Sequence, residues 1–163
     1  MKKKTVRLRS PRPGDMGRVV QMHGELYARE FGYDARFEAL VAGIVAGFVD
    51  HFDAKRERCW IAEMDGEVVG SVFLVGQSPT VAKLRLLIID PKARGQRLGR
   101  RLTQACIRFA KDKDYRRIVL WTQSHLAAAR AIYQRENFKL KSSEKHFSFG
   151  KRLVAETWEL ALD

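Results

Sequence analysis

The sequence is poor in cysteine, and this limits the chemistry that it can support. Only Cys59 and Cys106 occur among 163 residues, and neither belongs to a Cys-x-x-Cys pair. Each lies in an apolar segment, so we expect both to be reduced thiols in the core and not metal ligands. The pattern therefore predicts neither a disulfide nor a metal site.

Long apolar runs are absent too. No segment approaches the roughly 20 apolar residues that a membrane-spanning helix needs. The first residues, MKKKTVRLRS, lack the apolar region of a secretory signal peptide. We therefore expect a cytoplasmic protein with no membrane partner. It should form a single domain over residues 1–163, in which residues 1–4 are a flexible basic tail.

Two motifs that bind phosphate groups are also missing. The chain has no Walker loop, which ends in lysine followed by serine or threonine, and no Gly-x-Gly-x-x-Gly fingerprint of a dinucleotide-binding fold. Nucleotide hydrolysis and hydride transfer are therefore disfavoured.

Acidic residues are scarce beside basic ones. The chain has 31 lysines and arginines against 19 acids, a net charge of +12. Such a surface attracts nucleic acids, acidic membranes and anionic cofactors alike, and it can also be a solvated face that aids solubility. No aromatic RNA-binding motif or helix-turn-helix pair is present, so we do not expect a nucleic-acid partner.

Apolar periodicity and turn residues divide the chain into helices and strands. A helix opens at Gly14 and Asp15 and runs to about residue 30, and Asp65-Gly66 predicts a type I′ turn between two strands within residues 58–76. Further helices are expected at 35–49, 98–113 and 125–135, with strands at 5–9, 82–90, 116–121, 138–145 and 154–162. This order predicts an α/β (α+β) fold, with a mixed, mostly antiparallel central sheet of about seven strands flanked by four helices.

The segment PKARGQRLGRRL, residues 91–102, joins an apolar strand to an apolar-periodic helix and holds two glycines and four arginines. A glycine-containing turn that enters a helix presents free backbone N–H groups at the positive end of the helix dipole. Glycine allows a ligand oxygen to approach the backbone, and arginine adds charged contacts. The turn suits a phosphate or pyrophosphate, although an ordinary strand-to-helix connection has the same composition.

This turn resembles the Arg/Gln-x-x-Gly-x-Gly/Ala motif of the GCN5-related N-acetyltransferase (GNAT) family through residues 94–99. Downstream, AAARAIYQRENF resembles the family's Ala-x-x-x-Tyr-x-x-x-Gly-Phe segment through Ala129, Tyr133 and Phe138. The resemblance covers nearly the whole chain and implies the GNAT fold, in which the sheet splays between strands 4 and 5. Three further segments, HGELYAREFGYDARFE, RERCWIAEMDGEVVGSVFLV and SFGKRLVAETWEL, resemble the acetyltransferase half of MarR–GNAT fusion proteins.

The sequence departs from the family pattern at three positions. Arg97 replaces the middle glycine of the turn, so either its backbone adopts the same geometry or the turn is distorted. Leu126 stands where an asparagine is frequent, and Asn137 replaces the glycine before Phe138. Asparagine tolerates a positive φ better than most residues, so we expect the last change to be mild.

The resemblance implies that acetyl-coenzyme A (acetyl-CoA) is the co-substrate. It would be held by residues at the end of strand 4 and by the turn, namely Leu87, Ile88, Ile89, Arg94, Gly95, Gln96, Arg97, Leu98, Gly99 and Arg100. The acetyl group would pass to a primary amine by direct attack in a ternary complex. Tyr133 is the candidate acid for the leaving thiolate, because a phenol can donate a proton; a packed core aromatic is the alternative.

The candidate acceptor site comes from the first helix pair and the fourth strand. His23 and Tyr27 lie one helical turn apart and could line the acceptor cleft or pack in the core. The candidates for the general base are Glu25, Glu30, Asp34, Glu38 and His146, and the sequence does not choose among them.

Alternation along AKLRLLIID predicts that Lys83, Arg85, Leu87 and Ile89 share one face, unless a bulge changes the phase. Arg85 would then pair with an internal acid, Glu63, Glu156 or Glu159, or bind a carboxylate of a small, amino-acid-like acceptor. We list His23, Tyr27, Glu25 and Arg85 as predicted substrate-binding residues. Two other functions stay open: a non-catalytic module that binds coenzyme A, and a protein or ribosomal N-acetyltransferase. A homodimer is also compatible with the sequence.

Overall fold

The computed structural model describes residues 4–163, which contain a seven-stranded sheet and four α-helices. The elements follow one another as β1 (Val6–Arg9), α1 (Asp15–Phe31), α2 (Ala35–Asp50), β2 (Arg58–Met64), β3 (Glu67–Gly76), β4 (Val81–Ile89), the 3-10 turn η1 (Pro91–Ala93), α3 (Leu98–Asp112), β5 (Arg117–Gln123), α4 (Ala127–Arg135), β6 (Lys139–Ser148) and β7 (Lys151–Ala161). The predicted fold class is confirmed. Except for Lys4, the predicted flexible tail lies outside the described residues.

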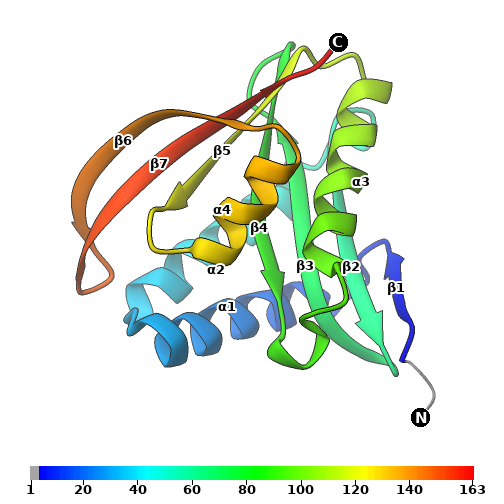
Figure 1. Cartoon of the computed structure of the whole chain (residues 1–163). Coiled ribbons are helices and arrows are strands. Elements are labelled where there is room, and N and C mark those ends of the chain that lie inside the picture. Colours follow the sequence, from blue (N-terminus) through cyan, green and yellow to red (C-terminus); the bar gives the residue numbers. More distant parts are fainter. Residues whose placement is uncertain (1–3) are drawn as a thin grey trace.

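The strands are arranged in the order β1-β2-β3-β4-β5-β7-β6, and every neighbouring pair is antiparallel except β4 and β5. Residues 81–84 of β4 pair with residues 117–120 of β5, and beyond this point the two strands have no paired residues. Figure 1 shows β4 and β5 diverging, with α4 beside the opening. The predicted splay between strands 4 and 5 is confirmed.

Apolar side chains cover both faces of the sheet. Helices α1 and α2 pack on one face through Val19, Val45 and Phe48, and the core against α3 and α4 contains Leu102 and Tyr133. In Figure 1, α3 and α4 lie in front of the sheet, α1 runs beneath it, and the β6–β7 hairpin curves away from the other strands. A molecule layered in this way buries both sheet faces.

Local turn chemistry follows the sequence closely. Asp65 and Gly66 both have positive φ, 52° and 78°, as a type I′ turn requires. Asn137 has φ 70°, which confirms that asparagine takes over from glycine before Phe138. The side chain of Asp34 accepts a hydrogen bond from the Arg36 amide and caps α2.

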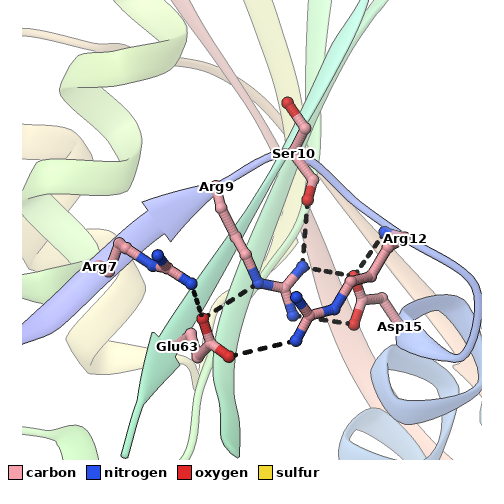
Figure 2. Close-up of polar contacts among 6 residues, drawn as sticks. All are labelled: Arg7, Arg9, Ser10, Arg12, Asp15 and Glu63. Atoms are coloured by element: carbon pink, nitrogen blue, oxygen red, sulfur yellow. Dashed lines mark hydrogen bonds and ion pairs between the residues drawn. The ribbon is translucent and has the colours of Figure 1, made fainter. Parts of the chain in front are cut away.

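Ion pairs fix the start of α1 against the sheet edge. In Figure 2 the Arg9 guanidinium lies between two carboxylates, with Nη1 2.7 Å from Asp15 Oδ2 and Nε 3.2 Å from Glu63 Oε2. Glu63 also accepts hydrogen bonds from Arg7 at 2.7 Å and Arg12 at 3.3 Å. The cluster joins β1, β2 and α1, which together place the helix that borders the site described next.

Candidate active site

Two cavities meet where β4 and β5 part. The larger, about 670 Å³, lies between the end of β4, the turn before α3 and helix α4, and we call it the turn cavity. The smaller, about 130 Å³, lies between β4, β5, α1 and α2, and we call it the aromatic cavity. Tyr27, Leu87, Leu126 and Ala129 line both. A ligand in one cavity can therefore reach a ligand in the other.

The turn cavity contains most of the residues predicted to hold the co-substrate. Its lining includes Leu87, Ile88, Ile89, Arg94, Gly95, Arg97, Leu98, Gly99 and Arg100. The prediction for Gln96 is not supported by its position, because this residue is absent from the lining and its side chain is half-buried elsewhere. Arg135 of α4 also lines the cavity and was not predicted. The volume is typical of a site for a drug-sized ligand.

The backbone of the turn is suited to an anion. Helix α3 begins after Arg97, and the first N–H groups of an α-helix have no partner within the helix. The positive end of the 15-residue α3 dipole therefore faces the cavity. Gly95 and Arg97 both have positive φ, 80° and 57°. The Arg97 backbone thus adopts the left-handed geometry that glycine usually takes, at a cost of about 1–2 kcal/mol for a residue with a Cβ.

Gly99 is required by packing. A Cβ at this position would lie 2.6 Å from Ile132 Cδ1 and 3.0 Å from Ile89 Cδ1. Both isoleucines line the turn cavity, so a larger residue would push their side chains into it. The sequence had suggested that Gly99 permits a ligand to approach the backbone. The nearest atoms instead show that it permits α3 to approach α4 and β4.

One arginine of the turn is held by an acid of α1. Arg94 Nη2 donates to Glu30 Oε1 at 2.6 Å, and both residues line the turn cavity. Glu30, one of the open candidates for a general base, therefore lies on the turn-cavity side and is already ion-paired. Among residues 4–163, Arg97 has no such partner.

Aromatic rings form much of the second cavity. Tyr27 packs against Phe37 with ring centroids 4.4 Å apart and against Tyr33 at 5.3 Å, and Phe149 stacks on Tyr33 at 5.2 Å. Phe149 lies at the tip of the β6–β7 hairpin with φ 57°, a strained value for a residue with a side chain. The Phe149 carbonyl accepts a hydrogen bond of 3.1 Å from the backbone N–H of Asp34, the N-cap residue of α2.

A bulge in β4 overturns the predicted alternation. Arg85 pairs with Phe73, but the next pair is Ile88 with Ser71, so β4 has one residue more than β3 between them. Leu86 takes φ 55° there. Lys83 and Arg85 consequently face the aromatic cavity under α2, whereas Leu87 and Ile89 pack on the α3 side. The extra residue reverses the faces of the strand.

The histidine and acid predicted on α1 have different surroundings. His23 lines the aromatic cavity, but it is almost fully buried, Nδ1 lies 2.8 Å from the Val19 carbonyl, and burial lowers its pKa to about 4. Tyr27 lines both cavities, and burial together with the Glu30 charge raises its pKa to about 12. Glu25 does not line either cavity, because it points outward from α1 and bonds Gln21 Nε2 at 3.0 Å. Its predicted contact with the acceptor therefore has no support in the geometry.

No aspartate or glutamate of the described chain lines the aromatic cavity. Asp34 is committed to Arg36, and the Glu38 carboxylate lies over Gly24 on the outer side of α1 and α2. His146 is held by Gln123 Oε1 and Ser148 Oγ, each at 2.9 Å. The acids that we had left open as bases are thus not brought to this cavity.

Tyr133 projects from α4 to the aromatic cavity, where the two strands part. The residue is 5% exposed, and its hydroxyl makes no hydrogen bond within residues 4–163. Because no fully buried side-chain polar atom among these residues lacks a partner, this hydroxyl must be accessible from the cavity. Burial and the neighbouring Tyr27 phenol raise the pKa of Tyr133, so the hydroxyl keeps its proton at neutral pH. Its ring packs in the core, as the alternative expected, and the residue also lines the aromatic cavity. Its role as the acid for the leaving thiolate stays a prediction.

One polar contact was not anticipated. The Tyr33 hydroxyl lies 2.7 Å from His125 Nε2, with Tyr33 in the aromatic cavity and His125 at the exposed rim of the turn cavity. Burial, followed by the Lys151 charge, lowers the pKa of His125. The two residues are 92 positions apart, and no local pattern links them.

Comparison with known proteins gives a consistent result. The model of the acetyltransferase (GNAT) family matches residues 22–138. The chain is 34% identical over 108 residues to N-acetyltransferase 8 from Homo sapiens, covering 63% of this chain and 47% of that protein. It is 33% identical over 81 residues to N-acetylaspartate synthetase from Xenopus tropicalis, covering 49% and 30%. The chain therefore spans less than half the length of these curated relatives.

A solved structure has the same fold. A protein assigned as an acetyltransferase from Salmonella typhimurium, solved with its cofactor acetyl-CoA, superposes with a TM-score of 0.77. The identity is 15%, and the match covers 97% of this chain and 94% of that one. At this identity the likeness is one of fold.

Proposed function

Because this chain belongs to the acetyltransferase (GNAT) family, we propose that it transfers the acetyl group of acetyl-CoA to a primary amine. The observation that carries the proposal is the junction of the two cavities at Tyr27 and Leu87. One cavity has the backbone and charge for a pyrophosphate, and the other is small and lies beside an unpartnered phenol. Such a pair suits direct transfer between two bound substrates.

The residues of the turn cavity fit acetyl-CoA. The N–H groups at the start of α3 suit the pyrophosphate, and Arg97, Arg100 and Arg135 supply positive charge around it. The end of β4 beyond Leu84 has no pairing with β5, so its backbone is free to bind the pantetheine arm. When bound, the co-substrate supplies the thioester carbon that the amine attacks.

The residues around the junction would divide the proton transfers. An ammonium loses its proton to Tyr33 as the Tyr33 hydroxyl proton passes to His125 Nε2, which leaves a neutral amine. The amine nitrogen then forms a bond to the acetyl carbon, and the carbon–sulfur bond breaks. Tyr133 donates its hydroxyl proton to the departing thiolate, which becomes the free thiol, and takes up the proton that the nitrogen loses as the amide forms.

A test of this mechanism is the replacement of Tyr133 by phenylalanine. Release of free thiol from acetyl-CoA in the presence of a panel of amines should fall about 10- to 1,000-fold. Calorimetry should show nearly unchanged affinity for acetyl-CoA. Unaltered turnover on a good acceptor would assign Tyr133 to packing alone.

A second variant tests the turn cavity. Gly99→Val should weaken acetyl-CoA binding strongly, because the branched side chain would displace Ile132 and Ile89 into the cavity. Circular dichroism and the melting temperature must show that the variant is folded. A folded variant with wild-type affinity would contradict the placement of the co-substrate.

The amine is proposed to be small and amino-acid-like, in line with the name of the N-acetylaspartate synthetase relative. Absence of thiol release with every amine, together with tight binding of coenzyme A, would favour a non-catalytic binding module. Acetylation of ribosomal or other proteins alone would favour a protein acetyltransferase.

Likeness to the acetyltransferase half of MarR–GNAT fusions, a cytoplasmic location and a homodimer remain predictions. Within residues 4–163, no helix has the length and apolarity to span a membrane.

A further inference from the structure

The aromatic cavity contains two cations that no acid of the described chain neutralises. Lys83 and Arg85 lie two residues apart on β4 and line the cavity on the same face. Both are half-buried. Across residues 4–163, neither side chain takes part in an ion pair or a hydrogen bond.

The acids that could have paired with them are engaged elsewhere. Glu63 binds the arginines of the β1 cluster. Glu156 accepts from Arg130 at 2.9 Å, and Glu159 accepts from Arg117 at 3.3 Å. All three internal acids expected as partners of Arg85 therefore bind other arginines.

Keeping two such cations together costs stability. Burial lowers the pKa of Lys83, and the nearby Arg85 charge lowers it further; burial also lowers the pKa of Arg85. A half-buried charge without a partner disfavours the folded state, and two like charges disfavour it more. An anion from outside the chain would offset this cost.

Chemistry and size restrict that anion. The cavity is about 130 Å³ and joins the turn cavity near Tyr133, so its ligand must be small and must place an amine there. A guanidinium binds a carboxylate through two parallel hydrogen bonds. Apart from the two cations, the cavity wall is mostly apolar and aromatic, with residues such as Tyr27, Phe37 and Ile44; its other polar members, His23, Thr122 and Gln123, carry no negative charge. This wall suits an apolar side chain and not a second charge.

We propose that the aromatic cavity binds an α-amino acid with an apolar side chain, whose carboxylate contacts Arg85 and Lys83 and whose amine points toward Leu87 and Tyr133. The proposal rests on the proposed acetyl transfer for its direction, but binding of the carboxylate can be tested without it. The same two charges also lower the pKa of an ammonium bound beside them. They therefore favour the neutral amine that acetyl transfer requires.

The experiment uses three matched ligands: leucine, leucinamide and 3-methylbutylamine. They share one side chain, and only the first carries a carboxylate. Calorimetry on the protein loaded with coenzyme A should show binding of leucine at least 10-fold tighter than of leucinamide. Thiol-release rates with acetyl-CoA should give the same order for kcat/KM.

Arg85→Gln should lower the affinity and kcat/KM for leucine about 10- to 100-fold, the loss expected for a charged hydrogen bond, and should spare the two ligands without a carboxylate. Lys83→Gln should have the same selective effect, and a smaller one. Arg117→Gln is the control, because this exposed cation on β5 pairs with Glu159 and lies outside both cavities. It should bind all three ligands like the wild type.

The outcomes separate the two proposals. Leucine binding that depends on Arg85, without transfer to any amine, would support the carboxylate site and count against the enzyme. Transfer to all three ligands at equal rates, unaffected by Arg85→Gln, would overturn the carboxylate site and leave the enzyme in place. Absence of leucine binding, or tighter binding of aspartate or phosphoethanolamine than of leucine, would also overturn it.

Discussion

The basic residues of β1 and those of β4 lie on the same sheet but in opposite surroundings. On β1, the Arg9 side chain is 13% exposed and contacts the carboxylates of Asp15 and Glu63 (Figure 2). On β4, Arg85 is half-buried beside Lys83 and contacts no carboxylate of the described chain. The β1 cations therefore join elements together, whereas Lys83 and Arg85 of β4 line a cavity.

This difference distinguishes residues that stabilise the fold from residues that reduce its stability for the sake of a ligand. Replacement of a buried charge that has a partner should destabilise the protein. Replacement of a buried charge without a partner should leave the protein as stable or make it more stable, and should weaken binding of the ligand instead. The two regions also differ in their acids. Glu63 accepts hydrogen bonds from three arginines, whereas no acid of the described chain lines the aromatic cavity.

The largest effect is expected from Arg9→Gln. Loss of the guanidinium leaves Asp15 buried without its charged partner and should destabilise the fold by about 1.5–3 kcal/mol. The melting temperature should fall by about 3–10 °C, while kcat/KM stays close to that of the wild type. Arg85→Gln, measured beside it, should melt at or above the wild-type temperature. Equal destabilisation by both variants would remove the distinction between the two regions.

A smaller effect should come from ligand binding to the β4 cations. Leucine at ten times its dissociation constant should stabilise the wild-type protein by about 1.4 kcal/mol, because it binds only the folded state. This corresponds to a rise in melting temperature of about 3–5 °C. Because its affinity should be 10- to 100-fold lower, Arg85→Gln at the same leucine concentration should show a rise of at most about 1–2 °C, and Arg9→Gln should show the full rise. A shift of equal size in all three proteins would place the bound leucine elsewhere.

Arg97 is a third cation without a partner within residues 4–163, and here the backbone conformation also reduces stability. Its replacement should change the free energy of unfolding less than the changes described above. Its unpaired side chain lines the turn cavity, and its φ of 57° is strained. Arg97→Gly should raise stability by about 0.5–1 kcal/mol and weaken acetyl-CoA binding by about 3- to 10-fold. Arg97→Lys keeps a charge at the same strained position and should leave stability unchanged. Stability equal to that of the wild type in Arg97→Gly would show that the turn is not strained.

The smallest effect concerns pH. Burial acts to raise the pKa of Asp15, but hydrogen bonds from Arg9 and the Arg12 amide outweigh it and lower the pKa, and Arg7 and Arg9 lower the pKa of Glu63. Their contribution is present above the unfolded pKa of about 4 and is lost as the pH falls through the lowered folded values.

Lys83 has the opposite sign, because its lowered pKa is a cost that is relieved only as the pH rises through the folded value. Urea midpoints between pH 7 and pH 3 should therefore fall less for Glu63→Gln than for the wild type, and Lys83→Gln should follow the wild type over this range. Parallel curves for wild type and Glu63→Gln would mean that the carboxylate is not stabilised by its arginines.

Short-range features were predictable because adjacent residues determine them. The type I′ turn at Asp65-Gly66 follows from local steric rules, and the order of elements follows from apolar periodicity. The positive φ of Asn137 was expected because the family motif has glycine there and asparagine tolerates that conformation. Residues 94–100, except Gln96, line the turn cavity, and the resemblance of this turn to the family motif had identified them as cofactor-binding residues.

Features that depend on distant residues were not predictable. The bulge at Leu86 placed Arg85 and Leu87 on opposite faces, and alternation along a strand cannot reveal an extra residue that only the pairing with β3 defines. The contact of Tyr33 with His125, and the arrival of Phe149 from the β6–β7 hairpin, likewise need the folded chain.

The fold class, the turn before α3 and the excess of cations over acids could therefore all be inferred from the sequence. The identity of the cations that have partners could not, because ion pairs such as Arg9 with Glu63 join residues 54 positions apart. Pairing depends on which side chains the sheet and helices bring within about 3 Å of each other. The composition shows only how many charges the chain has. In the folded chain, Arg9 of β1 is paired with Glu63, whereas Lys83 and Arg85 of β4 face a cavity.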